Sequence, residues 1–250
     1  MITKKNLLEQ EYMRVAGRIL ASVFSELQEA AKVGVSTKFL DDKAYSLIKS
    51  HSCEPAFLDY SGFPATICAS LNNEVVHGIP SDRVILKKGD IFSIDIGLIY
   101  KEYYADMAKT IAIGNISKRN RLLIDETKAS LADAIKKVVP GNTFGDIGAA
   151  IQQRVERNGL SVVREYVGHG IGKELHEEPQ IFNYGLPGQG VKIEEGMVFA
   201  IEPMVNLGGW KTKVLKDGWT VVTKDGSLSA HFEHTVLVTS NGQEVLTIDQ

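Results

Sequence analysis

Residues 86–95 read LKKGDIFSID, and residues 193–202, at an offset of 107, read IEEGMVFAIE. Each copy places a glycine before an apolar segment and ends on a carboxylate, Asp95 in the first copy and Glu202 in the second. Gly34 falls on Gly141 at the same offset. Self-similarity at a fixed offset indicates repeated supersecondary units. The sequence therefore predicts a pseudo-symmetric fold with a site shared between its two halves.

The spacing of apolar residues predicts a pair of helices followed by strands in each half. In the first half we expect helices over residues 9–31 and 37–50, and strands over residues 65–71, 75–77, 91–100 and 103–113. In the second half we expect helices over residues 119–138 and 143–159, and strands over residues 160–166, 197–205, 219–223 and 232–238. This order of elements predicts the α/β (α+β) class.

The composition is that of an ordinary globular protein, with 44% hydrophobic and 24% charged residues in a chain of 250. The net charge of −3 argues against a nucleic acid or an anionic membrane as the main partner, because there is no basic excess to neutralise phosphates. The apolar run at residues 19–24 is too short for a membrane span or a signal peptide, so we expect a cytoplasmic protein. Cys53 and Cys68 fit no CxxC pattern and are expected to be free thiols.

Two histidines, His169 and His176, lie in the segment GHGIGKELHEEP at residues 168–179. The segment is too rich in glycine for a stable helix and too polar for an ordinary core strand. Its composition suits a close approach of the backbone and an imidazole to a metal ion or a ligand. A single histidine is more often a structural residue, so the interpretation of His169 depends on acidic residues elsewhere in the chain.

Asp95 and Asp106 lie on neighbouring predicted strands. Alternation along residues 91–98 places Asp95 on the strand face opposite Phe92 and Ile94. Asp106 follows eleven residues later, so a hairpin turn between them brings the two carboxylates side by side. Two unpaired like charges would destabilise the sheet there, and the pair therefore calls for a cation.

The candidate metal site consists of one imidazole and four carboxylates from both halves: Asp95, Asp106, His169, Glu202 and Glu233. Burying several carboxylates without positive partners is costly, whereas two divalent ions about 3.5–4 Å apart would supply the charge and suit hydrolysis. Oxygen-rich ligands with one nitrogen suit manganese, cobalt, iron or zinc. The alternative is that these residues lie on solvated strand ends, the usual place of a single acidic residue.

Several motifs occur together: Asp95 and Asp106 eleven residues apart, the GHGIG segment followed by His176, IEP at residues 201–203, EHT at 233–235, and NNEVVHGIP at 72–80. In this combination the chain resembles the type I methionine aminopeptidases over essentially its whole length. The resemblance implies the pita-bread fold, a pseudo-two-fold pair of αββ halves with antiparallel sheet around a dinuclear metal site. It also implies a single catalytic domain over residues 1–250, with halves of about 1–115 and 116–250.

The same resemblance implies removal of the initiator methionine from nascent polypeptides whose second residue is small. A hydroxide activated by two divalent ions (cobalt, manganese, iron or zinc) would attack the first peptide bond. By position, Asp95 resembles a ligand of one ion, His169 and Glu202 resemble ligands of the other, and Asp106 and Glu233 resemble the bridging pair.

The resemblance also assigns residues that act on the substrate. Glu202 is the candidate proton shuttle, His176 resembles the residue that stabilises the oxyanion, and His77 resembles the one that places the substrate. The residues that match the methionine pocket, where a thioether sulfur favours aromatic contacts, are Tyr60, Phe63, Cys68 and Trp219. Core packing is the alternative role for the aromatic residues of this set.

Two positions depart from the family pattern. Leu175 stands where many members carry phenylalanine, and His231, two residues before Glu233, replaces a polar residue and has no assigned role.

Two alternative functions stay open: a proline-directed aminopeptidase of the same fold, which usually carries an additional N-terminal domain, and a catalytically silent binding protein of that fold, which usually lacks some ligands. We expect a monomer whose partner is the N-terminal methionine of nascent peptides. A transient contact with the ribosome surface is left open, and neither a nucleic acid substrate nor a membrane is expected.

Overall fold

The computed structural model describes residues 2–248, and their helices are α1 (Leu7–Ala30), α2 (Thr37–Ser50), α3 (Lys118–Ile135), α4 (Phe144–Glu156) and a short 3-10 helix η1 (Tyr60–Gly62). The strands of the first half are β1 (Glu54–Pro55), β2 (Ile67–Leu71), β3 (Glu74–Val76), β4 (Ile91–Tyr100) and β5 (Tyr103–Ala112). The second half adds β6 (Ser161–Val162), β7 (Gly168–Gly170), β8 (Glu177–Ile181), β9 (Val198–Ile201), β10 (Met204–Asn206), β11 (Thr212–Val214), β12 (Val221–Thr223), β13 (Ser229–His231), β14 (Glu233–Thr239) and β15 (Gly242–Val245).

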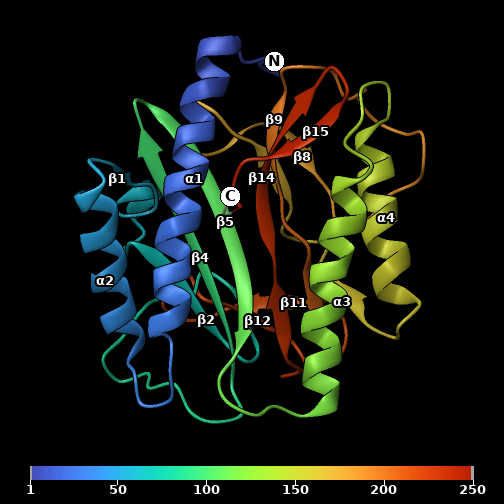
Figure 1. Ribbon diagram of the computed structural model, residues 1–250. Helices are drawn as coiled ribbons and strands as arrows, with labels where there is room; N and C mark the ends of the chain where they lie inside the picture. The colour runs from blue at the N-terminus through green and yellow to red at the C-terminus, as the bar shows by residue number, and fades with distance from the viewer. Residues whose placement is uncertain (1, 249–250) are drawn as a thin grey trace.

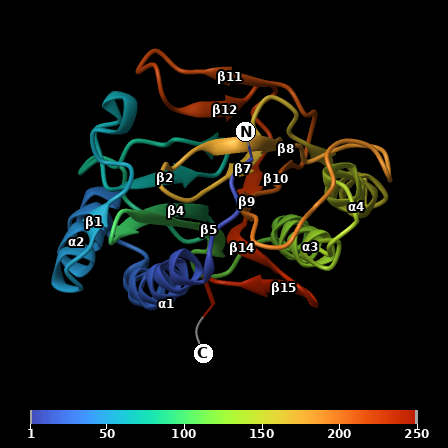
Figure 2. The same cartoon turned by 90° about the horizontal axis from the view of Figure 1, so that it is seen from above.

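The main sheet has the strand order β1-β4-β5-β14-β9-β7-β8, with β2 paired to β4 and β15 paired to β14. Its strand pairs are antiparallel. The two halves meet where β5 of the first half pairs with β14 of the second half; β5 also pairs with β4, and β14 also pairs with β9. Helices α1 to α4 lie along one face of this sheet, while β11 and β12 lie on the other side (Figures 1 and 2). The α/β pita-bread architecture expected from the sequence is thereby confirmed.

Each helical pair packs on the apolar face of its own strands. Leu20 and Phe24 of α1 share a buried cluster with Phe92 and Ile94 of β4. Helices α3 and α4 cover β9 and β14 in the same way through a second buried cluster. Asn6 caps the N-terminus of α1, and its side chain accepts hydrogen bonds from the first turn in a capping box. The apolar periodicity therefore predicted these four helices.

Backbone hydrogen bonds repeat at the offset predicted from the sequence. The Gly34 N–H donates to the Leu86 carbonyl at 2.8 Å, and the Gly141 N–H donates to the Ile193 carbonyl at 2.9 Å. Residues 36 and 85 form an isolated bridge, and so do residues 143 and 192. In both cases, each residue of the pair in the second half lies 107 positions after its counterpart in the first half. The repeat is thus a property of the backbone fold.

Several strands differ from the expectation, and the sequence analysis did not predict β1, β8, β11, β13 and β15. Residues 160–166 contribute only the short β6, and residues 197–205 are divided into β9 and β10 at Glu202 and Pro203, where proline has no N–H to continue the ladder. The glycine-rich segment forms strand β7 between β8 and β9, so its exclusion from the core sheet was wrong. A β-carbon on Gly168 would lie 2.4 Å from the Ala200 carbonyl oxygen, and glycine permits this close approach.

Within the described part of the chain, we find no helix that combines the length and the apolar character required to cross a membrane.

Substitution Gly17→Ala in α1 is expected to lower the melting temperature. A β-carbon there would lie 2.3 Å from the Leu246 carbonyl oxygen. Overpacking of this kind costs about 1–3 kcal/mol, which exceeds the gain of about 1 kcal/mol from replacing glycine by alanine in a helix. Thermal unfolding followed by circular dichroism measures the change. The control Ser22→Ala, at an exposed position of the same helix, should unfold at or slightly above the wild-type temperature; equal stability of the two variants would contradict the steric argument.

His234 should contribute a loss of stability as the pH decreases from about 6.5 to about 4. Burial, together with Lys109 and Lys128, lowers the pKa of His234 from 6.5 to about 4. Between these values the unfolded chain binds a proton that the folded chain does not, so acid favours unfolding. Melting temperatures measured across this range should fall less steeply for His234→Gln than for the wild-type protein. The exposed His51→Gln variant is the control, and identical slopes for His234→Gln and wild type would disprove the assignment.

Candidate metal centre

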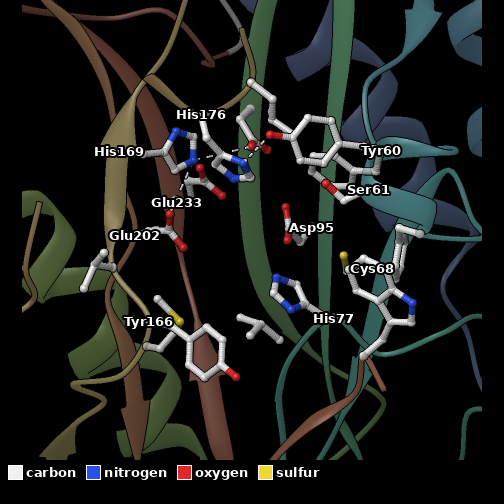
Figure 3. A pocket seen from close by; sticks show the side chains of 18 residues that line it. Tyr60, Ser61, Cys68, His77, Asp95, Tyr166, His169, His176, Glu202 and Glu233 are labelled. Atoms are coloured by element: carbon white, nitrogen blue, oxygen red, sulfur yellow. Dashed lines mark hydrogen bonds and ion pairs between the residues drawn. The ribbon is translucent and has the colours of Figure 1, made fainter. Parts of the chain in front are cut away.

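A cavity of about 380 Å³ lies on the face of the main sheet opposite the helices and has two kinds of wall (Figure 3). One wall carries the five residues of the candidate metal site: Asp95, Asp106, His169, Glu202 and Glu233. The other carries aromatic, histidine and thiol side chains. Its volume is in the range of small-molecule sites. The structure thus brings all five predicted metal ligands into one cavity.

Neighbouring strands of the sheet supply the five side chains. Asp95 comes from β4, Asp106 from β5, Glu233 from the start of β14, Glu202 from the end of β9 and His169 from β7. These strands follow one another in the order β4-β5-β14-β9-β7. Because side chains of adjacent strands that point to the same face lie close together, residues far apart in the sequence meet here.

The two aspartates are diagonal neighbours rather than directly opposite one another. In the β4–β5 ladder, Asp95 pairs with Ala108, and Asp106 pairs with Gly97. The turn between the strands consists of Lys101 and Glu102 alone, so the hairpin register follows from a two-residue connection. The prediction that this hairpin brings both carboxylates to the same side is correct, with an offset of two positions along the ladder.

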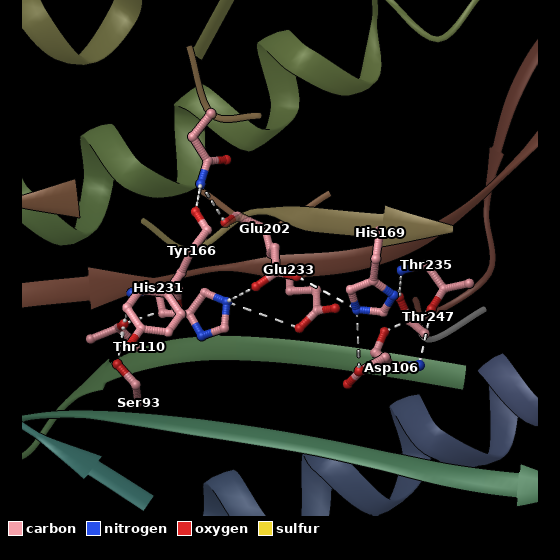
Figure 4. A network of polar contacts seen from close by, with 11 residues as sticks. Ser93, Asp106, Thr110, Tyr166, His169, Glu202, His231, Glu233, Thr235 and Thr247 are labelled. Carbon is pink, nitrogen blue, oxygen red and sulfur yellow. Dashed lines mark hydrogen bonds and ion pairs between the residues drawn. The ribbon is translucent and has the colours of Figure 1, made fainter. Parts of the chain in front are cut away.

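The tautomer of His169 follows from its surroundings. Its Nδ1 lies 2.9 Å from the carbonyl oxygen of Gly170, which can only accept a hydrogen bond, so Nδ1 carries the proton. In the neutral ring, Nε2 then presents a lone pair, and it faces Glu202 Oε1 at 3.6 Å and Asp106 Oδ2 at 4.0 Å (Figure 4). A lone pair directed at two carboxylates is the arrangement of groups that share a cation.

The polar atoms of this wall lack partners within the protein. Among the described residues, the buried side-chain atoms without a hydrogen bond are Asp95 Oδ1, Asp106 Oδ1, Glu233 Oε1, His231 Nε2 and Asn206 Oδ1, and all but the last belong to this wall or border it. Such atoms are costly unless something else binds them. Ligand atoms within 4.8 Å of one another form two groups, Asp106–His169–Glu233 and Glu202–His231–Glu233. The donor set therefore fits divalent cations, although Asp95 belongs to neither group.

Burial also opposes ionisation of the four carboxyl groups. It raises the pKa of Asp95 to about 7 and the pKa of Glu202 to about 8. Burial, together with the neighbouring carboxylates, holds the pKa of Asp106 and the pKa of Glu233 well above their usual range. Divalent cations would remove this mutual repulsion and favour the ionised forms.

The six residues predicted for the substrate all line the second wall: Tyr60, Phe63, Cys68, His77, His176 and Trp219. The Tyr60 hydroxyl lies 2.9 Å from His176 Nδ1, and the rings of Phe63 and Trp219 meet edge to face with centroids 5.2 Å apart. The aromatic residues are therefore cavity walls as well as packing partners.

Burial sets the protonation state of two of these residues. It lowers the pKa of His77 to about 4, so this imidazole is neutral at pH 7. Burial beside Asp95 and Asp106 raises the pKa of Cys68 well above its ordinary value. Cys68 is thus a neutral thiol, an apolar part of the wall rather than a nucleophile. Cys53 and Cys68 are both free and buried, as expected.

Sequence reasoning missed several residues of the cavity. Its lining also includes Phe57, Ser61, Val76, Tyr166, Val167 and Met204. These residues come from loops and short strands whose periodicity is too brief to indicate a face.

The buried Lys5 was missed as well. Its Nζ lies 2.6 Å from Glu177 Oε2 and so fixes the residue that follows His176. No motif in the sequence links Lys5 to that segment.

Comparison with known proteins places this site in a family. Residues 11–240 match the model of metallopeptidase family M24. A methionine aminopeptidase from Clostridium acetobutylicum is 51% identical over 248 residues, which are 99% of this chain and 99% of the relative.

Solved structures agree with the sequence comparison. The crystal structure of a methionine aminopeptidase from Thermotoga maritima superposes with a TM-score of 0.98 at 44% identity and covers 100% of both chains. A prolidase from Pyrococcus horikoshii, at 24% identity and a TM-score of 0.78, is matched over 64% of its length and shares the fold. From its sequence, its fold and its cavity, the chain belongs to metallopeptidase family M24 and, within that family, to the methionine aminopeptidases.

Proposed function

We propose that this protein removes the N-terminal methionine from polypeptides whose second residue is small, with two divalent metal ions held by Asp95, Asp106, His169, Glu202 and Glu233. The observation that carries the proposal is the cavity in which unpartnered carboxylate atoms face an aromatic wall across about 380 Å³. The two walls suit this reaction, since the carboxylate wall can bind cations and the aromatic wall can bind an apolar side chain.

Divalent ions at this wall supply Lewis acidity and lower the pKa of water toward neutrality. In this proposal Asp95 would hold one ion, His169 and Glu202 would hold the other, and Asp106 and Glu233 would contribute to both. Cobalt, manganese, iron and zinc all accept such donors. The Nδ1–H···O bond from His169 to Gly170 fixes the ring so that Nε2 faces Glu202 and Asp106 and would be free to hold an ion.

Glu202 and His176 move and hold protons in this proposal. Burial raises the pKa of Glu202 to about 8. Divalent cations would favour its ionised form, and this carboxylate can accept a proton and release it to the leaving amine. The Tyr60 hydroxyl lies 2.9 Å from His176 Nδ1, and we assign it as the donor. This tautomer leaves the proton of His176 on Nε2, from which it can be donated to the developing oxyanion. Burial lowers the pKa of His176, which keeps this ring neutral as the donor.

The apolar wall selects methionine. Phe63 and Trp219 offer ring edges and faces to a thioether, and the neutral thiol of Cys68 adds a soft contact. His77, held against Tyr166 and Trp219, places the peptide chain beyond the scissile bond.

The whole site comes from one chain, and we propose a monomer that acts as a single catalytic domain. Nascent peptides are made in the cytoplasm, and we place the enzyme there, with transient contact to the ribosome surface. Two alternatives differ from this proposal in a measurable way. A proline-directed enzyme would cleave a Gly-Pro peptide, and a silent binding protein would cleave no peptide.

Removal of metal should abolish methionine release. A chelator-treated sample is incubated with a Met-Gly-Met peptide and with a Gly-Pro peptide, before and after addition of manganese or cobalt, and free amino acids are quantified. We expect cleavage of the first peptide alone, and only with metal, because the carboxylate wall needs cations. Turnover without metal would refute the mechanism, and release of glycine from Gly-Pro would favour the proline-directed alternative.

Substitution Glu202→Gln should reduce kcat by about 10²–10⁴-fold, the usual contribution of a positioned acid or base. The amide retains the shape of the side chain but cannot accept a proton, so the melting temperature of the variant should change little. Steady-state kinetics and metal analysis are measured on the same sample. The exposed Glu195→Gln serves as the matched control with wild-type kinetics. A Glu202→Gln enzyme with wild-type kcat and full metal content would rule out the proton shuttle.

A further inference from the structure

His231 lies beside the metal centre and has no role in the proposed reaction. It ends strand β13, its side chain points toward Glu202 and Glu233 (Figure 4), and it is 1% exposed. Its Nε2 atom is buried and makes no hydrogen bond. A nitrogen of this kind, directed at two carboxylates, needs a partner.

The distances around His231 Nε2 suit a shared cation. Glu202 Oε2 lies at 3.5 Å and Glu233 Oε2 at 4.0 Å, both longer than an N–H···O hydrogen bond of about 2.7–3.2 Å. Two ligands bound to one ion at about 2.0–2.2 Å stand about 3–4 Å apart, depending on the bond angle. The corresponding distances at His169 Nε2 are 3.6 and 4.0 Å. The two histidines therefore face their carboxylates in the same way.

Glu202 lies between the two histidines. Its Oε1 faces His169, and its Oε2 faces His231. The side-chain amide of Asn183 donates to the Glu202 carbonyl at 3.1 Å and fixes the backbone at this point. One carboxylate can thus bind cations with each of its oxygens, with an imidazole beside each one.

The backbone of His231 is also fixed. Its N–H donates to Thr110 Oγ1 at 2.8 Å, and the Thr110 hydroxyl donates to its carbonyl oxygen at 3.0 Å. The Ser93 hydroxyl lies 2.7 Å from Thr110 Oγ1 and completes the network. Thr110 of β5 thus binds both the N–H and the carbonyl group of His231. Because the backbone is fixed in this way, Nε2 faces the carboxylates without rearrangement of the chain.

We propose that His231 Nε2 is a sixth metal ligand of this protein, which binds a divalent cation together with Glu202 and Glu233. The proposal rests on the metal-dependent function proposed above and adds a second nitrogen donor to a site that otherwise has one. A second imidazole makes the site softer and favours zinc, cobalt or iron over manganese.

A crystal structure of the wild-type protein with zinc, with anomalous differences recorded at the zinc edge, tests this directly. We expect a zinc ion about 2.0–2.1 Å from His231 Nε2 and bonded to Glu202 and Glu233. If zinc is bound by Asp106, His169 and Glu233 while His231 Nε2 only donates a hydrogen bond to Glu202, the sixth ligand is disproved and the proposed function stands. If no zinc binds to these carboxylates, the proposed function fails with it.

Zinc titration of the metal-stripped protein gives the solution counterpart. In His231→Gln, which keeps a polar side chain but removes the imidazole, the dissociation constant of one bound ion should rise by about tenfold or more. The matched control is His234→Gln, because His234 lies three residues further along, has its Nδ1 2.8 Å from Thr247 Oγ1 and lines no part of the cavity. We expect the control to bind zinc as the wild type does. Wild-type zinc affinity in His231→Gln would overturn the proposal.

Discussion

The burial of four carboxyl groups in one cavity is the constraint on which the rest of this structure depends. Asp95, Asp106, Glu202 and Glu233 come from four strands, and burial raises the pKa of each of them. No lysine or arginine lines this cavity, so within the described residues the protein provides no cation of its own. The arrangement is stable with its carboxylates ionised only when external cations bind, and for this reason the fold and the metal dependence belong together.

The pseudo-symmetric fold positions these carboxylates while keeping the two halves chemically different. Asp95 lies within the continuous strand β4, whereas its counterpart Glu202 lies at the break between β9 and β10, before Pro203. The break frees Glu202 from the ladder and lets its two oxygens face His169 and His231. The first half thus supplies rigidly paired ligands. The second half supplies Glu202, the carboxylate that faces both histidines.

The two walls of the cavity are coupled through the segment that follows β7. His169 faces the carboxylates and His176 faces Tyr60, and their rings meet edge to face with centroids 4.4 Å apart. The buried ion pair between Lys5 and Glu177 holds the far end of this segment. A ligand of the metal centre and a donor to the substrate therefore lie on one short stretch of chain, fixed at both ends, which keeps their separation constant during the reaction.

The sequence by itself determined the repeat, the four long helices and the identity of the five candidate ligands. Apolar periodicity and motif spacing are local properties, which are visible along the chain without knowledge of the fold. The sequence could not show that Gly168–Gly170 is an interior strand of the main sheet, since the close approach to Ala200 that requires glycine exists only after the sheet has formed. Nor could it assign His231, whose neighbours Glu202 and Thr110 are 29 and 121 residues away. Strand order decides such contacts, and strand order follows from the packing of the whole chain rather than from any one segment.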